Sequence, residues 1–387
     1  MATPARRGQW RLRLTPHADA QDYTVSWRLI RSENRYPFFG IMRFPFLARP
    51  GRAVPLPKVR TMSPNKKKVM LPETMAKAGW DVLIGRDDIE AVGYDPYISM
   101  PDLQVALKDT DGIALSLTPL KAPEIAVAPR LRVAARIGVG YDAVEIPALT
   151  ARGIPLMVVG TANSVSVAEH AIFMMYALAK KVMFQDAAVR DNRWQDRWKD
   201  IPVDLAERTI LIVGFGRIGT RTAKRCLAMD MTVLIYDPYV PAATIKAAGC
   251  EAVTDLEIAL PRADVVCIHC PKTPETVSMF NAARLARMKP SAYIINTARG
   301  GIIDEAALHA ALSAKKLAGA GIDVFDKEPT PTDNPLMKLP NTIVSAHMAG
   351  VTVESMDRMA IATVKNILSV LDGTPNKENA VNKEVFG

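Results

Sequence analysis

Residues 209–237 read TILIVGFGRIGTRTAKRCLAMDMTVLIYD, and this stretch decides the fold. An apolar run at 209–213 leads into the turn Gly214-Phe215-Gly216-Arg217-Ile218-Gly219, after which a helical pattern and a second apolar run follow. Glycines that follow a strand and open a helix are typical of a dinucleotide-binding turn. The first glycine permits the tight turn, the second lets the backbone approach a pyrophosphate, and the third lets the helix pack closely on the strand.

An acidic residue, Asp237, stands at the end of the second apolar run. A carboxylate at this position accepts hydrogen bonds from the adenosine ribose hydroxyls and repels a 2′-phosphate. Pro238 and Tyr239 follow it, with no arginine beside it. The sequence therefore predicts NAD rather than NADP, although a strand-end aspartate can also simply be solvated in a turn. The predicted cofactor residues of this turn are Gly214, Gly216, Arg217, Ile218, Gly219 and Asp237.

Short β-branched runs alternate with helical patterns on both sides of this stretch, which predicts an α/β protein with parallel sheets. A long helix is expected from Asn163, with Asn163, Ser164 and Ser166 as candidate caps, and the Trp194–Asp204 stretch is interpreted as a loop. The expected strands are 68–71, 112–116, 132–136, 155–159, 209–213, 232–236, 264–269, 292–296, 319–322 and 342–345. Further helices are expected at 100–108, 143–152, 217–229 and 352–371.

The net charge of +9 is concentrated in the first 61 residues, which contain 11 arginines and Lys58 against three acidic residues. The rest of the chain carries equal numbers of basic and acidic side chains, so its charge predicts no nucleic-acid partner. No run approaches the ~20 apolar residues that a membrane helix needs. Four cysteines without a disulfide-like spacing favour the reducing cytosol, which predicts a cytoplasmic protein.

Residues 1–61 differ from the rest of the chain in composition, being rich in arginine, proline and aromatic residues and poor in lysine. Such an acid-poor segment is compatible with an organellar transit peptide, but it lacks an amphipathic helical pattern. The preferred interpretation is a translated non-coding extension upstream of a true start at Met62. This segment is expected to be disordered or loosely packed and to take no part in catalysis.

Three polar residues follow the glycine turn in a fixed order: Arg299 in NTARG, Glu328 in DVFDKEP and His347 in SAHMAG. Reduction of a 2-oxo acid needs a cation for the carboxylate and a proton donor for the developing alkoxide. Arginine binds carboxylates in a bidentate way, and histidine titrates near neutral pH. This combination predicts an oxidoreductase acting on small 2-oxo or 2-hydroxy acids, with Arg299, Glu328 and His347 as its catalytic residues.

Several motifs together resemble the D-isomer-specific 2-hydroxyacid dehydrogenase family over residues 62–387: RIGVG at 136–140, NSVSVAE at 163–169, GFGRIG, NTARGG, GIDVFDKEP and AHMAG. The resemblance implies two doubly wound parallel-sheet domains. A Rossmann NAD domain at 161–345 would be inserted into a flavodoxin-like substrate domain formed by 62–160 and 346–387. It also implies a homodimer that forms across the cofactor domain.

The resemblance assigns roles to individual residues. Arg299 would hold the substrate carboxylate and carbonyl oxygen, His347 would donate the proton, and Glu328 would keep the imidazole protonated. Substrate would also be bound by the residues Ser116, Val139 and Gly140. Cofactor contacts would further involve Pro271, Thr276, Thr297, Ala298, Asp323 and Gly350, with Asp323 and the backbone near Thr297 orienting the nicotinamide carboxamide. No metal is expected.

Two departures from the family pattern concern the substrate. Phosphoglycerate dehydrogenases place an arginine beside the Ser-x-Thr element, whereas here Leu115 and Leu117 flank Ser116. A small, apolar or uncharged 2-oxo acid is therefore favoured over a phosphorylated one. Ala346 replaces the proline that commonly precedes the catalytic histidine.

Other functions stay open at this stage. They are a 3-phosphoglycerate dehydrogenase, a formate or phosphite dehydrogenase, and an NADH-sensing corepressor-like binding module. About a dozen residues follow the last expected helix, so no regulatory domain is expected there. Cys267-Ile268-His269-Cys270 resembles a metal or redox pair, but a strand directs Cys267 and Cys270 to opposite faces. A buried strand is the preferred interpretation.

Overall fold

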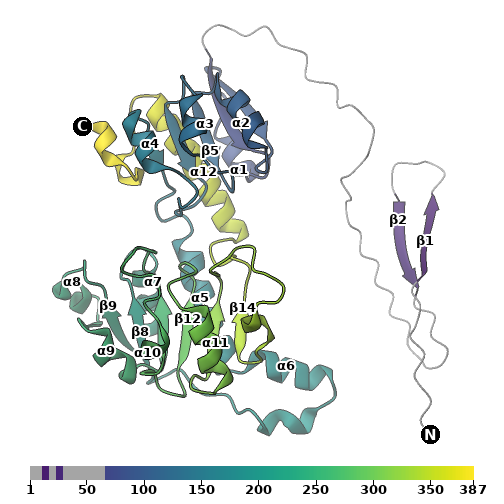
Figure 1. Ribbon diagram of the computed structural model, residues 1–387, viewed down its shortest axis with the longest axis vertical. Coiled ribbons are helices and arrows are strands. Elements are labelled where there is room, and N and C mark those ends of the chain that lie inside the picture. The colour runs from purple at the N-terminus through teal and green to yellow at the C-terminus, as the bar shows by residue number, and fades with distance from the viewer. Residues whose placement is uncertain (1–10, 17–22, 29–65) are drawn as a thin grey trace. The chain divides into compact units, whose positions relative to one another are not determined.

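The computed structural model describes residues 11–16, 23–28 and 66–387 (Figure 1). The first two ranges are strands, β1 (Arg11–Pro16) and β2 (Tyr23–Arg28), which pair antiparallel. The sequence predicted no strand there. The rest of the segment 1–61, expected to be disordered, lies outside the described residues.

A five-stranded parallel sheet forms the first part of the main unit, with the strand order β4-β3-β5-β6-β7. This is the order of the flavodoxin-like doubly wound fold. Its strands are β3 (Lys67–Pro72), β4 (Ile89–Tyr94), β5 (Gly112–Leu115), β6 (Val133–Arg136) and β7 (Leu156–Met157). The helices that accompany it in Figure 1 are α1 (Lys77–Asp81), α2 (Met100–Leu107), α3 (Ala122–Ala126), α4 (Ile146–Ala151) and α12 (Val353–Leu371).

Successive side chains of these strands enter two cores, because strand residues alternate between the faces of a sheet. Met70 packs with α2, α3 and α4 on one face, whereas Val69 and Leu71 pack with the buried side of α12 on the other. The Thr352 hydroxyl caps α12 by accepting a hydrogen bond from the Ser355 N–H, and the Ser355 hydroxyl accepts one from the Thr352 N–H. The C-terminal helix α12 therefore covers one face of the small sheet, which the predicted insertion requires.

A seven-stranded parallel sheet forms the second part, with the strand order β10-β9-β8-β11-β12-β13-β14. This is the Rossmann order with one further strand at the β13 edge. Its strands are β8 (Thr209–Val213), β9 (Thr232–Tyr236), β10 (Glu251–Ala252), β11 (Val265–Ile268), β12 (Tyr293–Asn296), β13 (Gly319–Ile322) and β14 (Thr342–Val344). Its helices are α5 (Ser164–Ala179), α6 (Val182–Arg190), α7 (Gly219–Leu227), α8 (Ala242–Ala247), α9 (Leu256–Ala259), α10 (Ala282–Leu285) and α11 (Glu305–Ser313).

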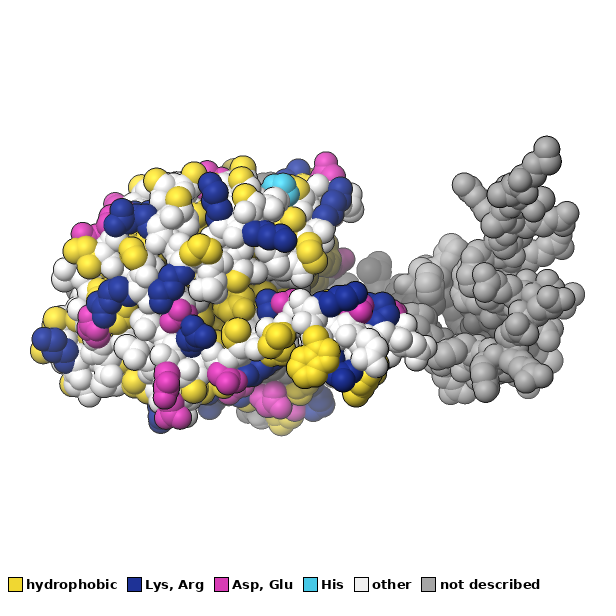
Figure 2. All heavy atoms as spheres, turned by 90° about the horizontal axis from the view of Figure 1, so that it is seen from below, with side chains coloured by type: hydrophobic (Ala, Val, Ile, Leu, Met, Phe, Trp, Pro, Cys, Tyr) yellow, Lys and Arg dark blue, Asp and Glu magenta, His cyan; other side chains and the backbone are white. Residues whose placement is uncertain are grey.

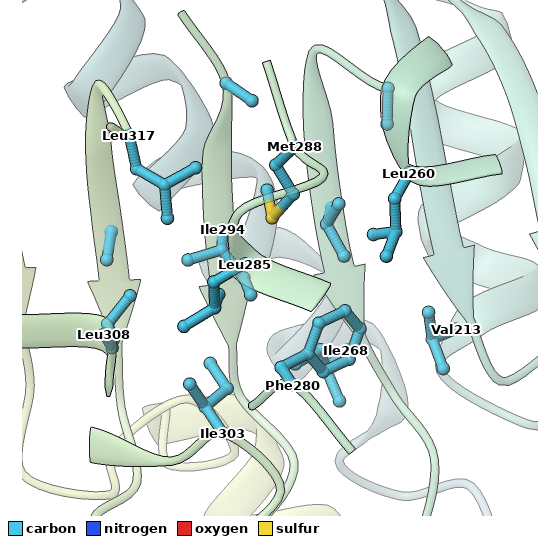
Figure 3. Packing of buried hydrophobic residues seen from close by; sticks show 14 of the residues in the cluster. Val213, Leu260, Ile268, Phe280, Leu285, Met288, Ile294, Ile303, Leu308 and Leu317 are labelled. Carbon is cyan, nitrogen blue, oxygen red and sulfur yellow. The ribbon is translucent and has the colours of Figure 1, made fainter. Parts of the chain in front are cut away.

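Both faces of this sheet are buried. One face packs on α5 and α7 through Met174, Met175 and Cys226. The other packs on α9, α10 and α11, where Phe280 lies among Ile268 and Leu285 (Figure 3). Fully buried aromatic and aliphatic side chains of this kind each contribute about 1.5–3 kcal/mol relative to exposure. The predicted fold class, two doubly wound parallel-sheet units with a Rossmann NAD-binding one, is confirmed.

Several expectations about local structure were wrong. The strands β4 and β10 were not predicted, and the predicted loop Trp194–Asp204 contains a 3-10 helix, η1 (Trp194–Trp198). Asn163 precedes α5 but its side chain makes no capping bond. Further 3-10 turns are η2 (Leu260–Arg262), η3 (Pro335–Lys338), η4 (Lys377–Asn379) and η5 (Lys383–Phe386). The domain boundaries at 160/161 and 345/346 stay predictions. In the described part of the chain, no helix is both long and apolar enough to cross a bilayer.

Candidate active site

The glycine turn lies between β8 and α7, at the carboxyl edge of the seven-stranded sheet. Gly214 has a φ of 101° and donates its N–H to the Tyr236 carbonyl at 2.9 Å. A Cβ on Gly219 would overlap the Gly214 carbonyl oxygen, so α7 packs against β8 at a distance that only glycine allows. A Cβ on Gly216 would meet no atom within 4 Å, so the backbone there is open to a ligand. Helix N–H groups beside an open backbone are the features that bind a pyrophosphate.

Asp237 lies directly beside this turn. Its Oδ2 accepts the Phe215 N–H at 2.7 Å, and its Oδ1 accepts the Tyr239 N–H at 2.9 Å. These bonds fix the carboxylate at the ends of β8 and β9 while leaving each oxygen a further lone pair. A ribose with two hydroxyl donors fits this arrangement.

Other polar groups near the same edge also suit a bound dinucleotide. The Thr297 hydroxyl is buried and has no hydrogen-bond partner among the described residues, so a ligand amide would satisfy it. Ala298 follows in a turn that Asn296 closes by accepting the Ala298 N–H at 3.0 Å. Thr276 is buried and donates to the Pro271 carbonyl at 2.8 Å, which shapes the loop after β11. The residues present therefore fit NAD.

His347 and Glu328 form a close pair. The Nδ1 of His347 lies 2.7 Å from Oε2 of Glu328, whose other oxygen accepts the Phe325 N–H at 3.0 Å. Both side chains are partly exposed, so the other ring nitrogen of His347 can meet a substrate. A carboxylate at Nδ1 fixes the orientation of the imidazole and the tautomer of its ring.

Asp323 shapes the loop that carries His347. It is fully buried, and its oxygens accept the Ser345 hydroxyl at 2.5 Å and the N–H groups of Met348 and Ala349 at 2.8 and 3.0 Å. Its carbonyl accepts the His347 N–H at 2.8 Å. His347 itself has a φ of 55°, in the left-handed region. One buried carboxylate thus holds the loop that carries His347 in a conformation that most residues avoid.

Arg299 follows β12 in the turn that Asn296 closes. The Arg299 carbonyl accepts Nδ2 of Asn296 at 2.9 Å, and Nη1 of Arg299 donates to the Ala298 carbonyl at 2.7 Å. Nε donates to Oδ2 of Asp142 at 3.2 Å, and a Cβ on Gly140 would overlap the guanidinium. The structure therefore brings the guanidinium of Arg299 against the backbone of Gly140, and their joint role in binding a carboxylate stays a prediction.

Known proteins share this architecture. The sequence model described as "D-isomer specific 2-hydroxyacid dehydrogenase, NAD binding domain" matches residues 172–349. The glyoxylate reductase of Thermofilum pendens is 36% identical over 292 residues, which are 74% of this chain and 86% of that protein. The D-3-phosphoglycerate dehydrogenase of Archaeoglobus fulgidus is 38% identical over 270 residues, which are 70% of this chain and 51% of that protein. The crystal structure of D-lactate dehydrogenase from Aquifex aeolicus, complexed with NAD and lactic acid, superimposes with a TM-score of 0.72 at 28% identity, covering 81% of this chain and 98% of that one.

The chain belongs to the D-isomer-specific 2-hydroxyacid dehydrogenase family. The predicted resemblance and the predicted NAD-binding domain are therefore confirmed. The chain spans about half the length of the phosphoglycerate dehydrogenases it matches. The roles of individual residues stay predictions. This includes the role of Asp323 in orienting the nicotinamide, because protein donors already bond to both of its carboxylate oxygens.

One cation near Ser116 was not predicted from the sequence. Arg136, at the end of β6, is mostly buried and donates to the carbonyls of Ser116 and Leu115 and, through Nε at 2.8 Å, to that of Gly140. Burial lowers the pKa of its guanidinium. No arginine flanks Ser116 in the sequence, but the neighbouring strand β6 brings the guanidinium of Arg136 to the Ser116 carbonyl. Leu115 itself is buried, whereas Leu117 is exposed.

The Cys-Ile-His-Cys stretch has a structural role here. His269 Nε2 lies 3.0 Å from the Thr222 hydroxyl, while its Nδ1 is buried without a partner among the described residues. Burial lowers the pKa of His269 to about 3. Burial also raises the pKa of Cys270 to about 11 and raises the pKa of Cys267 above its usual value. These thiols are protonated at neutral pH, so they are poor nucleophiles and poor metal ligands.

A second contact that sequence analysis missed joins the glycine turn to the segment before α5. Nη1 of Arg217 donates to the Gly160 carbonyl at 3.1 Å. Gly350, another predicted cofactor residue, lies against Asn163, since a Cβ there would come within 2.9 Å of the amide nitrogen, and its cofactor role stays a prediction. The side-chain amide oxygen of Asn163, Oδ1, is buried and has no partner among the described residues. Neither contact follows from the motifs, because both join segments far apart in the chain.

Proposed function

We propose that the protein catalyses reversible hydride transfer between NADH and a small, unphosphorylated 2-oxo acid, giving a D-2-hydroxy acid. The observation that carries this proposal is the pair of His347 Nδ1 and Glu328 Oε2 at 2.7 Å. An imidazole held in this way by a carboxylate is a proton donor with its second nitrogen free for substrate. The preference for the D-isomer rests on the family.

The chain's own residues divide the chemistry among them. A bound NADH supplies the hydride. Arg299 binds the substrate carboxylate and polarises the carbonyl, and the Gly140 backbone beside the guanidinium adds an amide donor. His347 donates a proton to the developing alkoxide and takes it back in the oxidative direction, while Glu328 stabilises the charged ring.

The choice of NAD over NADP rests on Asp237. A 2′-phosphate would have to approach a carboxylate that two backbone N–H groups already hold in place. Like charges in contact disfavour binding. We therefore expect NADH to be used in preference to NADPH, and Asp237→Ala to narrow the difference between them.

The preference for an unphosphorylated acid rests on the surroundings of Ser116. Leu115 is buried and Leu117 is exposed there, so β5 itself presents no cation. The Nε and Nη1 groups of Arg136 are already bonded to backbone carbonyls. Apolar surface and occupied donors favour a short or apolar side group on the 2-oxo acid.

A phosphorylated 2-oxo acid is the second candidate, and the position of Arg136 favours it. Its guanidinium bonds the Ser116 carbonyl, close to where the phosphoglycerate enzymes of this family place a phosphate-binding arginine. The curated relatives also include several D-3-phosphoglycerate dehydrogenases. A phosphate would then have to reach a donor of Arg136 that the described residues leave unbonded.

Purified full-length protein should be tested for NADH and NADPH oxidation with glyoxylate, pyruvate, hydroxypyruvate, phenylpyruvate and 3-phosphohydroxypyruvate. We expect turnover with NADH on an unphosphorylated acid, and a loss of at least about 100-fold in kcat for His347→Gln. His309→Gln is the matched control, because His309 lies on the exposed side of α11. A strong preference for 3-phosphohydroxypyruvate would establish the second candidate. NADH binding without turnover of any acid would contradict both.

We further propose that the protein is a cytoplasmic homodimer. The cysteines, all within the described residues, are free thiols, which suits a reducing compartment. Large apolar side chains gather at the surface of α5, α6 and η1, and Figure 2 shows hydrophobic groups among charged ones at this end of the molecule. They are Phe173, Tyr176, Val182, Met183, Val189, Trp194 and Trp198. Exposed apolar groups gathered in this way mark interaction sites.

Light scattering after size-exclusion chromatography tests the dimer. We expect twice the chain mass for the native protein and the single-chain mass for Trp198→Glu. Tyr239→Glu is the matched control, because this exposed aromatic residue follows β9, away from α6. A native protein that elutes with the mass of one chain would contradict the proposal.

A further inference from the structure

Three protein groups surround the guanidinium of Arg299. Nε faces the Asp142 carboxylate at 3.2 Å, Nη1 faces the Ala298 carbonyl at 2.7 Å, and Nη2 lies against the Gly140 backbone. Oδ2 of Asp142 also lies 3.5 Å from the position that a Cβ on Gly140 would take. The Asp142 carboxylate therefore occupies the corner between Arg299 and Gly140.

That corner is where the proposed function places the carboxylate of the substrate. A 2-oxo acid needs the arginine fork and the glycine backbone together, and Asp142 already gives a carboxylate oxygen to the arginine beside that backbone. The two carboxylates have the same charge and the same hydrogen-bonding capacity. They cannot both occupy the corner without repulsion.

Asp142 is held loosely. Its side chain is 71% exposed, whereas that of Arg299 is 28% exposed. Within the described residues, the bond to Arg299 is the only hydrogen bond of the Asp142 carboxylate. Exposed ion pairs of this kind contribute little to stability, so an incoming anion can displace Asp142 at small cost.

We propose that Asp142 is a positioning residue that mimics the substrate carboxylate. It holds Arg299 toward the Gly140 backbone before substrate binds, and it is displaced when a 2-oxo acid enters. Each acid that binds exchanges one ion pair for another, which weakens its apparent affinity. This inference rests on the proposed function and adds to it how the carboxylate site is kept ready.

The exchange makes a measurable prediction for Asp142→Asn. An amide keeps the size of the side chain but competes poorly for the guanidinium. Oxamate, an inert analogue of pyruvate, should bind the enzyme–NADH complex about fivefold more tightly, which corresponds to about 1 kcal/mol. The KM for pyruvate should fall in parallel, and the Kd of NADH should stay the same. Asp142→Glu should restore part of the competition.

The matched control is Asp81→Asn, since Asp81 is a surface carboxylate in an ion pair with Lys77, in α1. It should leave oxamate binding unchanged. Weaker oxamate binding by Asp142→Asn would overturn the proposal, because Asp142 would then support Arg299 in the complex rather than compete with substrate. Equal binding by the variant and the native protein would overturn it too, since the pair would then be a surface contact without consequence.

A second measurement separates this inference from the proposed function. Phenylglyoxal modifies accessible arginines, and mass spectrometry can follow the peptide that contains Arg299. Asp142→Asn should accelerate modification of Arg299 severalfold but leave Arg262, which pairs with Glu251, unchanged. Faster modification in a protein that binds no 2-oxo acid would contradict the proposed function and leave the ion pair established. An unchanged rate would overturn the contact itself.

Discussion

Acidification should destabilise this protein through His269. Its Nδ1 is buried without a partner among the described residues, and burial lowers its pKa from 6.5 to about 3. As the pH falls, the unfolded chain therefore binds a proton at this histidine before the folded protein does. The contribution of the uncharged His269 to the free energy of unfolding is fully present above pH 6.5 and is lost progressively as the pH falls toward 3.

The size of the effect follows from the two pKa values. At pH 5 the unfolded chain gains about 2 kcal/mol from protonation that the folded protein does not match, whereas at pH 7 the difference is only a few tenths. Because His269 as a residue is partly exposed, about 2 kcal/mol is an upper value.

Urea unfolding of the native protein and of His269→Gln at pH 7 and pH 5 measures the contribution of His269 to the free energy of unfolding. Comparing the two proteins removes the contribution of carboxylates, which both share. The native protein should lose about 2 kcal/mol more than His269→Gln between the two pH values. His309→Gln, on the exposed side of α11, should behave like the native protein. Equal pH sensitivity of the native protein and His269→Gln would refute the buried, uncharged state of this ring.

Four further substitutions test the structure of the sites and of the core. Gly219→Ala should lower both the melting temperature and the affinity for NADH, because its Cβ would overlap the Gly214 carbonyl. Gly216→Ala has open space around the new Cβ and should lower only the affinity for NADH. Equal melting temperatures of the two variants by scanning calorimetry would argue against this packing. Asp323→Asn should leave one of the N–H groups of Met348 and Ala349 without an acceptor, at about 1–3 kcal/mol, and should lower kcat more than KM in steady-state kinetics. Phe280→Ala should cost about 3–5 kcal/mol in urea unfolding because this ring is fully buried, and a cost below 1 kcal/mol would contradict the core of Figure 3.

The parts of the site that could be predicted from the sequence are those in which spacing along the chain dictates geometry. The glycine turn and Asp237 follow consecutive strands of one sheet, so their proximity is a local property of strand, turn, helix and strand. Glu328 and His347 lie only 19 positions apart and follow the adjacent parallel strands β13 and β14. Parallel strands end at the same edge, so residues that follow them meet.

The contacts that escaped prediction depend on neighbours in space. Arg136 pairs with Leu115 across two adjacent strands, so its side chain reaches the Ser116 carbonyl from β6, although no cation stands near Ser116 in the sequence. The strand β4 has buried residues only at its two ends, because it lies at the edge of the small sheet. An edge strand needs no continuous apolar run, and the sequence search relied on such runs.

The two halves of the chemical site are supported in opposite ways. Asp323 is fully buried and holds the His347 loop with three hydrogen bonds, so the proton donor has little freedom before substrate arrives. Asp142 is exposed and holds Arg299 through a single bond, so the carboxylate clamp can exchange its partner. A rigid donor favours the chemical step, whereas an exchangeable clamp affects substrate binding. Changes at Asp323 should therefore appear mainly in kcat and changes at Asp142 mainly in KM, and the reverse pattern in steady-state kinetics would mean that burial does not determine which step each carboxylate controls.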